Sequence, residues 1–230
     1  MTTKAEPADW KLFIATNTRL LAPPLVPEIR LHLAEESLPI WRKTEEELGE
    51  LNVPPPYWAF AWAGGQALAR YLLDNPEITR GRRVFDLGAG SGLTAIAAMR
   101  AGASSTLAAD VDKVALAAVA LNAEANSVTV ATTADDLLRF PPARYCEVIL
   151  VGDLFYEREL AERVERFIVR AASEGAHILI GDPGRSYFPK GRFEKVAEYR
   201  VPVTRELEDA EIKQTAVWQI PAGAVCAIDL

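Results

Sequence analysis

The segment DLGAGSG at residues 86–92 directly follows the short apolar stretch at 84–85. Glycine at every second position lets a backbone turn tightly and approach a ligand closely. A dinucleotide-binding fingerprint would place its third glycine at position 93, which is Leu93. Asp86 adds a carboxylate that suits an ammonium group better than a pyrophosphate. The segment therefore predicts a cationic, nucleotide-like ligand, and S-adenosylmethionine fits this description. The expected contacts are Asp86, Gly88, Gly90 and Gly92.

Acidic residues also follow the next two apolar stretches of the chain. In open α/β sheets, ligands bind beyond the carboxyl ends of the strands. Asp110 lies at such an end, where its carboxylate can accept hydrogen bonds from both hydroxyls of a ribose. We expect Asp112 to cap the helix that follows. Asp135 is our candidate for the adenine amino group, with a plain helix cap as the alternative.

The elements that would position these residues alternate regularly between strand and helix. Strands alternating with helices at this spacing indicate right-handed crossovers and a parallel sheet covered on both faces. The last third differs, because two strand-like segments at 196–203 and 213–220 are joined by a polar stretch rather than a helix. We therefore predict an α/β fold with a mostly parallel sheet and a C-terminal antiparallel hairpin. The predicted strands are 83–87, 106–109, 128–132, 147–151 and 176–180, and the predicted helices are 64–73, 92–100, 113–122 and 157–172.

Proline clusters at 23–24 and 54–56 bound an N-terminal extension. Segments 27–36 and 41–51 of this extension have helical composition. We accordingly divide the chain into a helical extension at residues 1–55 and a catalytic domain at residues 56–230.

Composition excludes several classes of protein. A net charge of −7 argues against a nucleic-acid partner, because such proteins carry a basic face for phosphates. Two histidines and two cysteines, none of them clustered, cannot assemble the usual zinc ligands, so we expect no metal. No apolar run approaches the roughly 18 residues that a membrane span requires. We expect a cytoplasmic monomer.

Three segments carry a resemblance to a known family. DLGAGSG resembles the nucleotide-binding motif of class I methyltransferases, which have a Rossmann-like seven-stranded sheet. GDLFY at 152–156 resembles the Asp-x-x-Tyr motif of protein lysine methyltransferases within that class. The longer strings at 56–76, 152–157 and 181–185 resemble the lysine methyltransferases of the electron transfer flavoprotein β subunit. The resemblance implies S-adenosylmethionine as cofactor and that subunit as partner, with a ribosomal component as a further candidate acceptor.

The chemistry of a lysine acceptor suggests roles for the residues near these motifs. A free lysine has a pKa near 10.4 and must lose a proton before it attacks a methyl group. Asp153 can hold the ammonium and orient the neutral amine, so we expect Asp153 and Tyr156 to be catalytic. Aromatic walls favour cations. The wall candidates are Phe155 on the substrate side and Trp58 and Trp62 on the cofactor side, with core packing as the alternative for both tryptophans.

Three further residues are candidates with an ordinary structural alternative. Gln66, after Gly64-Gly65, lies at an expected helix start, where free N–H groups can bind a cofactor carboxylate. Asp182 and Arg185 of GDPGR are expected to contact the substrate, unless the segment is only a tight turn. Two other functions stay open: a small-molecule N-methyltransferase, and a nicotinamide-dependent oxidoreductase, against which position 93 argues.

Overall fold

A computed structural model of the chain describes residues 10–35, 56–139, 146–203 and 210–221. Its largest sheet has seven strands in the order β5-β4-β3-β6-β7-β9-β8. All strands from β5 to β7 in this order are parallel, whereas β9 is antiparallel to both of its neighbours. The predicted fold class, including the C-terminal antiparallel hairpin, is therefore confirmed. The strands are β3 (Arg83–Leu87), β4 (Ser105–Ala109), β5 (Ala131–Thr133), β6 (Val148–Gly152), β7 (His177–Asp182), β8 (Glu194–Pro202) and β9 (Ile212–Gln219).

Helices cover both faces of this sheet. Successive strand residues point to opposite faces, and in the central strands both sets of side chains are apolar. In β6, Val148 and Leu150 pack in one cluster with apolar residues of α3 and α4. Ile149 and Val151 pack on the other face with Phe167 and its neighbours in α6. Both faces are buried, which explains why these strands are continuous apolar runs. The main helices are α3 (Ala63–Asp74), α4 (Leu93–Arg100), α5 (Lys113–Ala125) and α6 (Arg158–Ser173).

The described part of the N-terminal extension contains helix α1 (Trp10–Asn17) and an antiparallel pair of short strands, β1 (Arg19–Leu21) and β2 (Leu31–Leu33). The helix predicted at 27–36 is wrong, because residues 31–33 form β2. Leu31 and Leu33 are both buried and His32 between them is half-buried, which is the two-residue period of a strand. The helix predicted at 41–51 lies outside the described residues.

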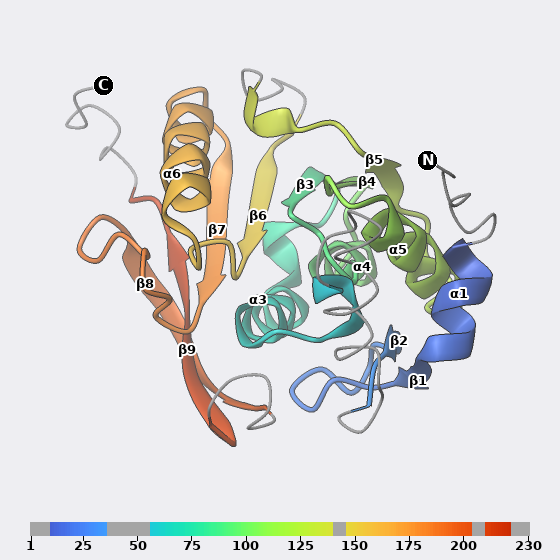
Figure 1. Cartoon of the computed structure of the whole chain (residues 1–230). Helices are drawn as coiled ribbons and strands as arrows, with labels where there is room; N and C mark the ends of the chain where they lie inside the picture. The colour runs from blue at the N-terminus through green and yellow to red at the C-terminus, as the bar shows by residue number, and fades with distance from the viewer. Residues whose placement is uncertain (1–9, 36–55, 140–145, 204–209, 222–230) are drawn as a thin grey trace, which may run out of the picture.

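The extension packs onto α5, and Figure 1 shows α1 beside α5 at the opposite end of the molecule from β8. Two buried asparagines, Asn122 of α5 and Asn126 directly after this helix, bind the backbone of the extension. Asn122 accepts a hydrogen bond from the His32 N–H at 2.7 Å, and Asn126 accepts one from the Arg30 N–H at 3.0 Å. The extension thus shares a core with the rest of the chain, and the division at residues 55 and 56 stays a prediction.

Candidate active site

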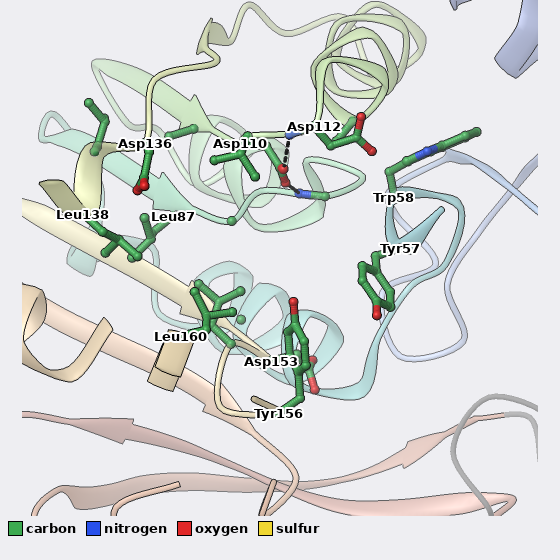
Figure 2. Close-up of a pocket in the computed structure, with 18 of the residues that line it drawn as sticks. Tyr57, Trp58, Leu87, Asp110, Asp112, Asp136, Leu138, Asp153, Tyr156 and Leu160 are labelled. Carbon is green, nitrogen blue, oxygen red and sulfur yellow. Dashed lines mark hydrogen bonds between the residues drawn. The ribbon is translucent and has the colours of Figure 1, made fainter. Parts of the chain in front are cut away.

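The carboxyl ends of the parallel strands open into a cavity of about 410 Å³. Figure 2 shows Asp110 and Asp112 on one side of this cavity and Asp153 and Tyr156 on the opposite side. The predicted site residues that line it are Trp58, Trp62, Gly88, Gly90, Asp110, Asp135, Asp153, Tyr156 and Arg185. The location agrees with the rule that ligands bind beyond strand ends in such sheets.

The glycine-rich segment forms the turn between β3 and α4. Gly88, Gly90 and Gly92 have φ angles of 65°, 51° and 78°, in the left-handed region that other residues rarely adopt. Gly88 and Gly90 line the cavity, and a Cβ atom added to Gly90 would have no neighbour closer than 4.0 Å. Gly92 lies at the start of α4, and a Cβ atom added to it would meet Val119 of α5. The turn therefore leaves space above its backbone at Gly90.

Asp110 follows β4 and is fixed by two backbone donors. Its carboxylate accepts hydrogen bonds from the Gly90 N–H at 2.9 Å and from the Asp112 N–H at 3.0 Å. Burial raises the pKa of Asp110, while these N–H groups act in the opposite direction. Asp112 accepts a hydrogen bond from the Val114 N–H at 2.8 Å, so the predicted cap of α5 is confirmed.

Asp86 has a different place from the one expected. Its carboxylate is almost fully buried and accepts hydrogen bonds from the Thr94 hydroxyl at 2.6 Å and from the Ala95 N–H at 3.0 Å. Burial raises the pKa of Asp86 to about 7. Because the side chain points toward α4 and does not line the cavity, the predicted direct contact with a ligand ammonium is not supported. Asp86 instead ties the start of α4 to β3.

One end of the cavity combines an apolar wall with a carboxylate. Asp135 lies there and accepts a hydrogen bond from the Thr133 hydroxyl at 2.9 Å. Figure 2 shows Leu87, Leu138 and Asp136 grouped at this end. Asp136 pairs with Arg139 and Arg163, whose guanidinium groups hold its pKa below the usual range. Flat apolar ligands with an exocyclic donor suit such a surface. Apolar residues that line the cavity and that the sequence did not indicate include Val111, Leu137, Leu138 and Leu160.

The other end of the cavity is aromatic. The rings of Tyr57 and Tyr156 lie 5.8 Å apart between centroids, and Tyr57 also packs edge-on against Trp62 at 6.0 Å. The Trp62 indole N–H donates to the Tyr57 carbonyl at 2.9 Å. Trp58 lines the cavity and also packs in a buried cluster with Ile14, so its core packing is confirmed and its contact with the cofactor stays a prediction. Tyr57 was missed, although it lies between Pro56 and Trp58 in the aromatic segment.

Tyr156 lies at the mouth of the cavity with 44% of its surface exposed. Partial burial, followed by the neighbouring Tyr57, Glu157 and Asp110, raises the pKa of its hydroxyl to about 12. The hydroxyl consequently keeps its proton at neutral pH. It can donate a hydrogen bond but cannot act as a general base under these conditions.

Asp153 follows β6 in a left-handed conformation, with a φ angle of 57°. Such a conformation costs roughly 1–2 kcal/mol for a residue with a Cβ atom, and it is held by the hydrogen bond from the Asp153 N–H to the Gly181 carbonyl at 3.0 Å. The carboxylate accepts the Gly65 N–H at 3.0 Å and two N–H groups of Arg185 at 2.6 and 3.0 Å. Asp153 is thus an ion-paired carboxylate. The sequence did not predict this partner.

Two glycines bring α3 close enough for this contact. A Cβ atom added to Gly64 would overlap with the Gly181 carbonyl, and one added to Gly181 would overlap with the Gly64 carbonyl. Only two glycines permit this approach between helix and strand. The approach places the Gly65 N–H against Asp153, so the free N–H expected at this helix start binds a protein carboxylate in this structure.

Three other predicted site residues have structural roles and do not line the cavity. The Gln66 side chain donates to the Ala61 carbonyl at 2.7 Å and accepts from the Leu25 N–H at 3.2 Å, so it fastens the extension. Phe155 is fully buried and packs against Phe188 at 5.3 Å between ring centroids. Asp182 is buried within its own turn, which is the structural alternative for that residue. These predicted cofactor and substrate contacts are not supported.

Comparison with known proteins finds methyltransferases among the relatives of this chain. A family model described as ribosomal protein L11 methyltransferase (PrmA) matches residues 66–173. The electron transfer flavoprotein beta subunit lysine methyltransferase of Danio rerio is 37% identical over 92% of this chain and 83% of its own length. The Xenopus laevis protein of the same name is 40% identical over 90% and 85%. The fold also resembles N-methyltransferase NodS of Bradyrhizobium japonicum, with a TM-score of 0.52, 14% identity, and coverage of 80% and 99%.

The fold and the site define a methyltransferase of the Rossmann-like class. Within this class, the chain belongs to the family of electron transfer flavoprotein β-subunit lysine methyltransferases. In the described part of the chain, no helix has the length and apolar character needed to cross a membrane. The same residues contain no cluster of three or more histidine, cysteine or acidic side chains suited to a metal ion.

Proposed function

We propose that this protein transfers methyl groups from S-adenosylmethionine to lysine side chains of the β subunit of electron transfer flavoprotein. The observation that carries the proposal is the position of Asp153. This carboxylate lies across the cavity from Asp110, beside the aromatic end formed by Tyr57, Trp62 and Tyr156. One side of the cavity thus suits a nucleoside and the other suits a cationic side chain.

The donor set of the cavity fits the cofactor. Asp110 is fixed by Gly90 and Asp112, and its carboxylate would accept the ribose hydroxyls. The apolar wall beside Asp135 would hold the adenine. A smaller hollow of about 50 Å³, which shares Gly90 and Asp153 with the main cavity, would accept the methionyl part. When bound, S-adenosylmethionine supplies an electrophilic methyl group.

The chain's own residues would bind and orient the lysine. Asp153 would attract the ammonium, and the ring faces of Tyr57 and Trp62 would stabilise its positive charge. Tyr156 keeps its proton, so we assign it to orientation of the amine by a hydrogen bond. Tyr57 and Tyr156 are 40% and 44% exposed, and the proton would leave to solvent past these rings.

Methylation of the purified β subunit tests the proposal directly. The enzyme, labelled S-adenosylmethionine and the β subunit are incubated together, and mass spectrometry then locates the added methyl groups. We expect methyl groups on exposed lysines, and lysine-to-arginine substitutions at those positions should abolish the label. A wild-type enzyme that labels free amines but leaves the β subunit unmodified would instead favour the small-molecule alternative.

Acceptance of a ribosomal component, the cytoplasmic location and the monomeric state stay predictions. Labelling of a cell lysate by the enzyme would reveal additional acceptor proteins, and light scattering would measure the mass of the enzyme in solution.

A further inference from the structure

Arg185 places a positive charge at the point where a lysine ammonium would enter. Its Nη2 lies 2.6 Å and its Nε 3.0 Å from Oδ1 of Asp153. Its guanidinium carbon lies 5.7 Å from the centre of the Trp62 ring. The arginine side chain is 20% exposed and the aspartate side chain is 11% exposed. A resident cation therefore already contacts the carboxylate and the ring that are suited to a substrate cation.

The turn that carries Arg185 is built to aim it there. Oδ1 of Asp182 accepts the Gly184 N–H at 2.7 Å and the Arg185 N–H at 2.8 Å. Asp182 itself is 1% exposed and is the last residue of β7, next to β6, which precedes Asp153. Arg185 is consequently held by its backbone, its ion pair and its ring contact. It does not behave as a flexible surface arginine.

The charge at this point decides how easily a bound lysine loses its proton. An unpaired Asp153 carboxylate would stabilise the ammonium form and raise the pKa of the lysine. A neighbouring guanidinium disfavours a second cation and lowers that pKa. The ion pair has a net charge near zero, so it can orient the amine without holding the proton on it.

Of the other titratable groups near this point, Tyr156 keeps a constant charge at neutral pH, whereas Asp182 titrates there. Tyr156 keeps its proton because its pKa is raised. Asp182 is buried behind the ion pair, and burial, with Asp153 as a smaller cause, raises its pKa to about 7. The other titratable groups that line the cavity or influence Tyr156 are Tyr57, Asp110 and Glu157, and Asp110 lies on the side of the cavity opposite the pair. Asp153 and Arg185 are the two charges that contact each other directly.

We propose that Arg185 is a positioning residue that balances the charge of Asp153, so that the bound lysine loses its proton at a lower pH than it would beside Asp153 alone. This inference rests on the proposed lysine methylation. It gives Arg185 a role in proton loss, whereas a contact with the protein surface of the substrate would affect binding alone.

The pH dependence of turnover separates these roles. We would measure kcat and KM for the flavoprotein β subunit from pH 6 to 10 for wild type, Arg185→Gln and Arg185→Lys. In Arg185→Gln, Asp153 loses the guanidinium group, and we expect the rising limb of the pH profile of kcat to move upward by about one pH unit. Turnover should then fall about tenfold at neutral pH and return toward the wild-type value at high pH, with no rise in KM. Arg185→Lys keeps the positive charge, so the rising part of its kcat profile should lie at the same pH as in wild type.

A second measurement keeps the proposal testable if Arg185→Gln folds poorly. In Arg185→Ala, free guanidinium ion at millimolar concentration should move the limb back toward its wild-type position. Equal loss of kcat at every pH, or an unmoved limb, would overturn the proposal. A wild-type enzyme that methylates no lysine at any pH would refute the proposed function itself, whereas an active wild type with an unmoved limb in Arg185→Gln refutes only the role of Arg185.

Discussion

Asp86→Asn should make the folding stability of the protein less sensitive to rising pH. Asp86 is 1% exposed, and burial raises the pKa of its carboxyl from 3.8 to about 7. Asparagine has nearly the same shape and keeps an oxygen that can accept from the Thr94 hydroxyl and the Ala95 N–H. The substitution therefore removes the titration of this side chain while preserving the tie between β3 and α4.

The size and sign of the effect follow from the two pKa values. Below pH 3.8 both the folded and the unfolded protein hold the proton, so this group does not change stability. Between pH 3.8 and 7 the unfolded chain loses the proton and the folded chain keeps it, so stability falls as pH rises. Above pH 7 the buried Asp86 carboxylate lowers the free energy of unfolding by its full amount, which is at most about 4 kcal/mol.

Urea unfolding of both proteins at pH 4, 6 and 8 measures this difference. The unfolding free energy of Asp86→Asn minus that of wild type should grow with pH and level off above pH 7. Asp182 and Asp112 also have raised pKa values, but both are present in the two proteins, so their contribution cancels in the difference. A difference that is the same at every pH would refute the reasoning.

Three further outcomes test the site. Asp153→Asn should lower lysine methylation by about two orders of magnitude and change cofactor affinity in calorimetry far less, although Asp153 also borders the smaller hollow. Parallel loss of both would place Asp153 on the cofactor side. Asp110→Ala should weaken cofactor binding by roughly 1–3 kcal/mol, and an unchanged Kd would contradict its ribose contact. Asn122→Ala should also weaken cofactor binding, because Asn122 donates to the Ser91 carbonyl of the glycine turn at 2.9 Å. Its matched control, Asn126→Ala, removes contacts to the extension without touching that turn, and equal losses of affinity would show that Asn122 has no special role.

The sequence predicted the parallel core well because each central strand is a short apolar run between glycine or acidic residues. The predicted strand at 83–87 coincides with β3, and the helix predicted at 157–172 differs from α6 by one residue at each end. Prediction failed for β2, where two buried leucines alternate with a histidine over only three residues. A helix and a strand cannot be distinguished by period over so short a stretch.

Site residues could be predicted from the sequence where they directly follow a strand, because the end of a parallel strand fixes their place in the fold. Asp110 and Asp153 directly follow strands, and both reach the cavity. Asp86 is an interior residue of β3, where alternation turns its side chain toward α4. Phe155 packs with Phe188, and Asp153 pairs with Arg185, 32 residues away. Contacts over such distances depend on how the turns after β6 and β7 fold, which no local pattern contains.

The contact between Gly64 and Gly181 restricts how this enzyme can be engineered. Replacing a helix glycine by alanine is a common way to stabilise a protein, because alanine lowers the entropy of the unfolded chain. At Gly64 the same change would push α3 away from β7, since the new methyl group would occupy the space of a backbone carbonyl. A second substitution at Gly181 cannot compensate, because it adds bulk to the same contact. Stabilised variants should therefore keep both glycines. Gly175 is no substitute site, because its φ angle of 96° would strain any side chain although an added Cβ atom there meets nothing within 4 Å.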